Sequence, residues 1–170
     1  MAPERRADSL VNTHRVDRLV SVCALLNAER ARYLVVGGYA VALHGVVRAT
    51  KDIDILIEPS IENAHRTLAA LEHLPFQVAR DVNPTDLINR FITIVGDTPR
   101  VDVLTLAFSV RYADARPGRL TRKIDGITIP FLDLDMLIRS KQTGRPQDVA
   151  DIASLERIKV LQGSPRRRRR

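Results

Sequence analysis

Apolar residues recur every three or four positions along several stretches of the chain, which is the spacing of one face of an α-helix. In the first stretch, Val16, Leu19, Cys23 and Leu26 fall on one side of such a helix. Ser60 stands directly before another stretch and is a typical N-cap residue. The spacing predicts four longer helices and one short helix of small residues, over residues 9–31, 39–45, 61–74, 133–143 and 147–161.

Short apolar or alternating stretches between these helices predict strands. Asp52–Ile57 and Arg100–Leu106 alternate between polar and apolar residues, as half-buried strands do. Asp125-Gly126 favours a type I′ hairpin turn between two further strands. The predicted strands cover residues 33–36, 52–57, 76–79, 91–95, 100–106, 123–124 and 127–131. The order of these elements predicts a mixed α/β (α+β) domain, with helices flanking a small mixed sheet.

The length of 170 residues is close to that of a single domain, and 45% of the residues are hydrophobic. We expect one domain over residues 9–161, with disordered ends at 1–8 and 162–170. No apolar run approaches the roughly 20 residues of a membrane-spanning helix, and no secretory signal follows the N-terminus. The single cysteine, Cys23, excludes an internal disulfide framework and a cysteine-rich zinc site. The sequence therefore predicts a cytoplasmic protein with no membrane partner.

The net charge of +7 is concentrated at the C-terminus, in the five arginines of residues 166–170. Without them, 22 basic residues face 20 acidic ones, and the net charge is only +2. The body of the protein is thus nearly balanced, and charge alone does not predict a nucleic-acid-binding face. The arginine run is either a solvated end or a segment that holds RNA through salt-dependent phosphate contacts.

Gly37-Gly38 follows an apolar strand and precedes a short helix. A backbone without side chains can approach a phosphate group closely, and a helix N-terminus favours anions. A turn from strand to helix also needs glycine for its geometry alone. The pair therefore indicates either a phosphate-binding turn or a structural turn.

Three aspartates on two predicted strands are the candidates for chemistry. Side chains alternate along a strand, so Asp52 and Asp54 point to the same face. Two such carboxylates repel each other unless water solvates them or a cation lies between them, and carboxylate oxygens suit Mg²⁺. If the strand that carries Asp102 pairs with theirs, a third carboxylate joins this face, and the three would suit a two-metal site.

The combination of Gly37-Gly38, Asp52-x-Asp54 and a later strand with Asp102 resembles the nucleotidyltransferase superfamily with the polymerase-beta-like palm. The resemblance is greatest to its minimal bacterial AbiEii-like branch and covers residues 34–155. The segments that carry it are Val35–Gly45, Arg48–Asp54, Lys141, Gly144–Asp148 and Asp151. Many relatives have serine after the first glycine, where this chain has Gly38. Glycine at this position is common in the AbiEii-like branch.

The resemblance implies a palm with a short C-terminal helical element, and the transfer of a nucleoside monophosphate from an NTP to an acceptor hydroxyl with release of pyrophosphate. It assigns Asp52, Asp54 and Asp102 to catalysis and to the binding of two Mg²⁺ ions, or of Mn²⁺ in their place. It also implies that Gly37 and Gly38 hold the β- and γ-phosphates.

Two cations are further candidates for phosphate binding. Arg48 either clamps a phosphate or forms a salt bridge that orients Asp52 or Asp54. Lys141 either contacts the triphosphate, as a lysine in this region does in relatives, or stabilises the C-terminus of its helix. Asp148 and Asp151 are expected to stabilise the N-terminus of the last helix.

Three functions fit these residues. The first is a Mg²⁺-dependent nucleotidyltransferase that acts on RNA or protein as the toxin of a toxin–antitoxin pair. The second is the same enzyme class acting on a small molecule such as an antibiotic. The third is a non-catalytic interaction module that keeps the fold. The expected partners are an NTP and, for the chain itself, an antitoxin or a second copy in a homodimer.

Overall fold

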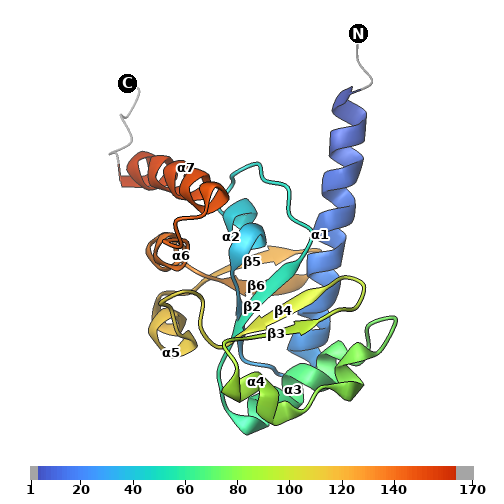
Figure 1. The fold of residues 1–170 in the computed structure, drawn as a ribbon. Coiled ribbons are helices and arrows are strands. Elements are labelled where there is room, and N and C mark those ends of the chain that lie inside the picture. The colour runs from blue at the N-terminus through green and yellow to red at the C-terminus, as the bar shows by residue number, and fades with distance from the viewer. Residues whose placement is uncertain (1–3, 164–170) are drawn as a thin grey trace, which may run out of the picture.

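The computed structural model describes residues 4–163, with side chains from Val16 onward, and forms a mixed α/β fold (Figure 1). In this part of the chain, six strands form one sheet in the order β3-β4-β2-β1-β6-β5. The strands are β1 Tyr33–Val35, β2 Ile53–Ile57, β3 Ile92–Val95, β4 Val101–Leu104, β5 Leu120–Ile124 and β6 Ile127–Phe131. The helices are α1 Glu4–Ala28, α2 Gly37–Leu43, α3 Ile61–Leu71, α4 Pro84–Asn89, α5 Tyr112–Ala115, α6 Leu134–Ser140 and α7 Pro146–Gly163, with 3₁₀ turns η1 Val78–Asp81 and η2 Arg116–Gly118.

The sheet is mixed, as the sequence predicts. β2 runs antiparallel to β1 and parallel to β4, and β6 runs parallel to β1. The outer pairs, β3 with β4 and β5 with β6, are antiparallel. Strands β1 and β2 therefore lie in the middle of the sheet, which explains why nearly all of their side chains are buried.

The helices form two groups around the sheet. α3 contacts both α1 and α4, and α1 also packs on β6. α2 packs on β2 and contacts α6, which in turn contacts α7. Figure 1 shows α2, α6 and α7 together at the upper left and α1 on the right of the strands. The C-terminal helices thus lie beside the short helix that begins at Gly37.

Several predicted local signals are confirmed. Ser60 caps α3, because its hydroxyl accepts a hydrogen bond from the backbone N–H of Asn63. Asp125 and Gly126 both have positive φ angles, of 49° and 81°, as a type I′ turn requires. α6 begins after Asp133, whose carboxylate accepts a hydrogen bond from the backbone N–H of Met136.

The predicted strand at residues 76–79 is wrong. Gln77 has a φ of 55°, and the chain then forms the 3₁₀ turn η1. The backbone N–H groups of Phe76 and Val78 donate to the Asp97 carboxylate, at 3.0 and 3.1 Å. These amides are therefore satisfied by a side chain rather than by a neighbouring strand.

Helices α4 and α5 are not predicted. Asn83 and Pro84 carried a readable signal for α4, because the Asn83 side chain accepts a hydrogen bond from Thr85 N–H and proline occupies the first helical turn. α5 is a single turn of four residues, too short for a periodic pattern.

The ends of the chain differ from expectation in extent. α1 begins at Glu4, so the helix runs through residues 4–8 of the segment expected to be disordered, where glutamate, arginine and alanine favour helix. α7 ends at Gly163. Residues 1–3 and 164–170, including the arginine run, lie outside the described residues.

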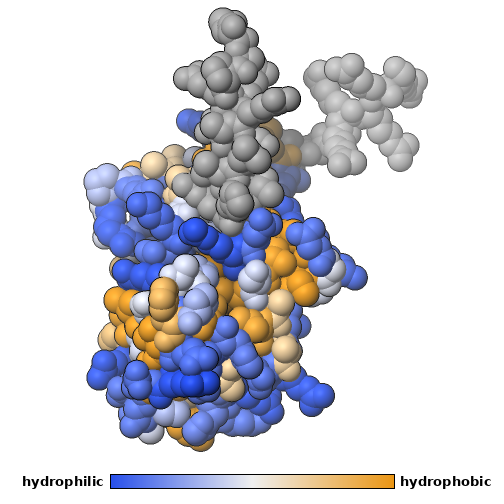
Figure 2. All heavy atoms as spheres, turned by 90° about the vertical axis from the view of Figure 1, so that its right-hand side faces the viewer, coloured by the Kyte–Doolittle hydropathy of each residue, from blue (hydrophilic) through white to orange (hydrophobic). Residues whose placement is uncertain are grey.

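Viewed from the side of α1, hydrophobic residues form small groups among hydrophilic ones (Figure 2). Within residues 4–163, no helix is both long and apolar enough to cross a membrane.

Candidate functional site

The pairing of β2 with β4 brings the three predicted acidic residues together. In this parallel pair, Asp54 and Asp102 are direct register partners, so their side chains leave the sheet on the same face. Asp52, two residues before Asp54, shares that face. We call Asp52, Asp54 and Asp102 the carboxylate cluster. All three line one cavity of about 560 Å³.

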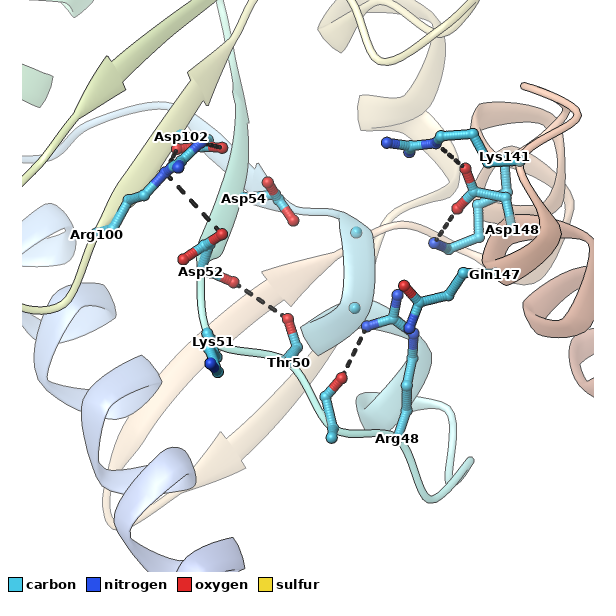
Figure 3. Close-up of a pocket in the computed structure, with 14 residues that line it drawn as sticks. Arg48, Thr50, Lys51, Asp52, Asp54, Arg100, Asp102, Lys141, Gln147 and Asp148 are labelled. Atoms are coloured by element: carbon cyan, nitrogen blue, oxygen red, sulfur yellow. Dashed lines mark hydrogen bonds and ion pairs between the residues drawn. The ribbon is translucent and has the colours of Figure 1, made fainter.

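The other side of the cavity is formed by positively charged side chains. Arg48 comes from the loop after α2, Lys141 from the end of α6 and Arg145 from the turn before α7. We call these three residues the cation cluster. In Figure 3 the labelled aspartates of the carboxylate cluster lie on one side of the cavity, and Arg48 and Lys141 lie on the other.

Gly37 and Gly38 lie between the two clusters, at the start of α2. Gly37 has a φ of 62°, and a Cβ atom there would overlap the Asp54 carboxylate. A Cβ atom at Gly38 would overlap Arg48 Nη1 and the Thr50 side chain. The glycine pair thus lets an acidic and a basic side chain approach the backbone, a reason that the sequence did not reveal.

The Arg100 guanidinium forms a bidentate ion pair with the Asp102 carboxylate. Its Nε donates to Oδ1 at 2.7 Å and its Nη2 donates to Oδ2 at 2.8 Å. The same Nε lies 4.0 Å from Asp52 Oδ2. The alternation along β4 already placed Arg100 on the face of Asp102, but this bidentate pair was not predicted.

Asp54 is held in an unfavourable electrostatic environment. Burial is the largest of the effects that raise the pKa of its carboxyl from 3.8 to about 6, and the nearby charges of Asp102 and Asp52 contribute to the same rise. Lys141 and Arg48 oppose this effect but do not cancel it. The charge of Asp54 is therefore only partly compensated, and a bound cation would compensate it further.

The donor chemistry of the carboxylate cluster fits a divalent cation. Its oxygens are the hard ligands that Mg²⁺ and Mn²⁺ take, and the Arg100 guanidinium already stands against Asp102 as a cation would. Among the residues that the structure describes, no three His, Cys, Asp or Glu side chains are grouped as a ready-made set of metal ligands. A cation held by all three aspartates would share the Asp102 carboxylate with Arg100 or displace Arg100 from it.

Lys141 is buried, with 5% of its surface exposed, and contacts two acids of α7. Its Nζ lies 3.0 Å from Asp148 Oδ1 and 2.8 Å from Asp151 Oδ2. Arg48 Nε donates to both oxygens of Asp151 at 2.9 Å. Of the two alternatives for Arg48, the salt bridge to Asp52 or Asp54 is therefore wrong, because Asp151 takes that bond.

Asp148 is satisfied by several donors. Lys141 contacts one of its oxygens, and Thr143 and Arg145 donate to the other at 2.6 and 2.7 Å. Burial alone would raise the pKa of this carboxyl, but the hydrogen bonds from Thr143, Lys141 and Arg145 outweigh it and lower the pKa. Asp148 lies in the first turn of α7, as predicted, but its ion pairs were not foreseen.

Comparison with known proteins supports the same fold and family. A family model described as "Nucleotidyltransferase of unknown function (DUF6036)" matches residues 14–163. The fold is similar to the crystal structure of an antigenic nucleotidyltransferase-like protein from Paracoccidioides brasiliensis, with a TM-score of 0.51 and 21% identity. That similarity covers 82% of this chain and 75% of the fungal one. A search of curated proteins gave no match.

Proposed function

The chain belongs to the DUF6036 family of nucleotidyltransferases, and we propose that it transfers a nucleoside monophosphate from an NTP to an acceptor hydroxyl. The observation that carries the proposal is the cavity of about 560 Å³ with the carboxylate cluster on one side and the cation cluster on the other. An NTP with its divalent cation has the complementary distribution of charge, because it combines a polyanionic triphosphate with a dication.

In this proposal, Asp52, Asp54 and Asp102 hold Mg²⁺, or Mn²⁺ in its place. When bound, the metal neutralises charge on the phosphates and favours the ionised form of the acceptor hydroxyl. The acceptor oxygen attacks the α-phosphorus, the bond to the β-phosphate oxygen breaks, and pyrophosphate leaves with that electron pair.

Asp102 is the residue that we assign to the acceptor. Its carboxylate lies on β4, on the side of the carboxylate cluster away from α2. An oxygen of Asp102 accepts the proton of the hydroxyl as the new bond forms. Each of these oxygens accepts one hydrogen bond from Arg100 and keeps a further lone pair for this proton.

The cation cluster is the proposed site of the triphosphate. Arg48, Lys141 and Arg145 lie across the cavity from the carboxylates. The backbone at Gly37 and Gly38 lies between the two clusters, and the missing Cβ atoms leave room there for the Asp54 carboxylate and for Arg48 Nη1. Such an arrangement catalyses transfer mainly by positioning and by charge neutralisation.

The resemblance to the AbiEii-like branch extends the proposal to a toxin that modifies RNA or protein, with an antitoxin as its partner. A small-molecule acceptor requires no change in the roles of the residues. The acceptor class is therefore decided by experiment, with total RNA, cell lysate protein and hydroxylated small molecules as separate acceptor pools.

The test uses each radiolabelled NTP with Mg²⁺ or EDTA, and compares the wild type with Asp54→Asn. We expect transfer by the wild type in Mg²⁺ and none by the variant or in EDTA. Asp86→Asn is the matched control, because Asp86 is an aspartate of α4 whose ion pair with Arg90 is exposed. Equal transfer by wild type and Asp54→Asn would contradict the proposal, as would its persistence in EDTA.

A further inference from the structure

Asp151 connects the C-terminal helix to the loop that leads into the carboxylate strand. Its carboxylate binds Arg48, which is 103 residues earlier in the chain, and also Lys141. Both partners line the cavity, whereas Asp151 is not among the lining residues. With 5% of its surface exposed, Asp151 lies behind the two cations and has no direct route to a substrate.

The geometry of Arg48 shows what this contact achieves. The Nε of the guanidinium donates to Asp151, while Nη1 donates to Ala49 O and lies against Gly38. Nη1 of Arg48 is thereby turned toward the start of α2, between the two clusters. An arginine held through Nε presents its terminal N–H groups in a fixed direction.

Asp148 offers an internal contrast. It also contacts Lys141 and is also buried, with 3% of its surface exposed. Its remaining donors, Thr143 and Arg145, are within five residues of it. Asp148 therefore closes the turn between α6 and α7, whereas Asp151 alone of the two reaches Arg48.

We infer that Asp151 is a positioning residue for the triphosphate, which sets the direction of Arg48 and fixes Lys141 beside it. The inference rests on the proposed function, since it names how that site holds its NTP. The inference predicts a change in anion affinity opposite in direction to the change that simple electrostatics predicts. Removing a negative charge from beside the cation cluster should by itself tighten the binding of an anion, whereas loss of positioning should weaken it.

The experiment measures binding of Mg²⁺ with a non-hydrolysable NTP analogue, and of inorganic tripolyphosphate, by titration calorimetry. We expect Asp151→Asn to bind both about tenfold more weakly, less than the roughly hundredfold cost of an ångström of misplacement in a catalytic site. Asp148→Asn removes a charge from Lys141 and Arg145 but leaves the contact between Asp151 and Arg48 in place, so it should weaken binding less than Asp151→Asn does. In an Arg48→Gln background, most of the effect of Asp151→Asn should disappear.

Kinetics give a second reading wherever transfer is detected. Asp151→Asn should raise KM for the NTP more than it lowers kcat, whereas a purely structural role would reduce the fraction of folded enzyme and leave KM unchanged. Thermal unfolding checks that each variant is folded. If Asp151→Asn does not fold, Asp151→Glu takes its place, because it keeps the charge and shifts the carboxylate by one methylene.

The outcomes separate the inference from the proposed function. Wild type that binds neither the NTP analogue nor tripolyphosphate would overturn the proposed function and this inference with it. Wild type that binds them, with Asp151→Asn equal or tighter, would overturn the inference alone. Equal weakening by Asp148→Asn and Asp151→Asn would also overturn it, because general disruption of the ion pairs would then suffice.

Discussion

The two sides of the cavity use the same residue type in opposite ways. On the strands, Asp54 is surrounded by other carboxylates, and its pKa is raised to about 6. On α7, Asp148 is surrounded by donors, and its pKa is lowered. Burial is the largest cause of the rise at Asp54, and it also acts to raise the pKa of Asp148, where hydrogen bonds outweigh it. The neighbours decide whether a buried aspartate is a satisfied structural group or an anion that lacks a counter-charge.

The largest expected effect is the loss of stability caused by Lys141→Ala. It would leave Asp148 and Asp151 buried with one cation fewer, which typically costs about 4 kcal/mol of unfolding free energy. Urea unfolding followed by circular dichroism measures it. Lys159→Ala is the control, because the Lys159–Asp135 pair is well exposed and its loss should change stability little. Similar losses for the two variants would contradict the buried network.

Asp148→Asn should destabilise the protein at pH 7, by about 3 kcal/mol, because buried donors lose a charged acceptor. The lowered pKa means that this contribution is complete above the ordinary pKa of 3.8 and is lost as the pH falls below it. The difference between wild type and variant should therefore shrink on acidification, as measured by urea unfolding between pH 3 and 7. A difference that grows toward low pH would contradict the assignment.

Asp54→Asn should have the opposite effect and raise the free energy of unfolding. The raised pKa means that the folded protein binds more protons than the unfolded chain between pH 3.8 and about 6, so ionised Asp54 destabilises it above that range. In EDTA at pH 7.5, the variant should be more stable than the wild type, on the order of 2 kcal/mol. The gain should vanish near pH 4. Equal stability of wild type and variant at both pH values would mean that ionised Asp54 does not destabilise the folded protein.

The smallest effect isolates the close contact between the glycine turn and Asp54. Gly37 and Gly126 both have positive φ, but only a Cβ atom at Gly37 would meet another group. Gly126→Ala should cost about 1 kcal/mol for the left-handed backbone alone. Gly37→Ala should cost about 1 kcal/mol more, because the new methyl group displaces Asp54. Equal costs in chemical unfolding would show that Asp54 moves aside freely.

The carboxylate cluster could be predicted because its geometry is local. Period-two alternation places Asp52 beside Asp54, and a single strand pairing then brings Asp102 to the same face. The sheet and its longer helices follow from the same short-range periodicities. The family resemblance added the roles of these residues, and those roles stay predictions until activity is measured.

The contacts between the cation cluster and α7 could not be predicted in the same way. The central contact joins Arg48 to Asp151 across 103 residues, and no repeat or spacing in the sequence encodes that distance. The position of Asp148 and Asp151 near the N-terminus of α7 was a sufficient local reason for two acids, so their ion pairs were not predicted. At residues 76–79, an apolar stretch suggested a strand, but the distant Asp97 side chain satisfied its amides instead.

The order of the segments along the chain has a consequence for synthesis on the ribosome. The carboxylate strands are complete once Leu104 has been made, whereas Lys141 and Asp151 belong to the last helices. A nascent chain can therefore assemble its acidic half early, together with Arg48, but Lys141, Arg145 and Asp151 are made later. On the proposed mechanism, an unfinished chain would be inert, and the order of synthesis would confine nucleotide transfer to chains that have reached α7.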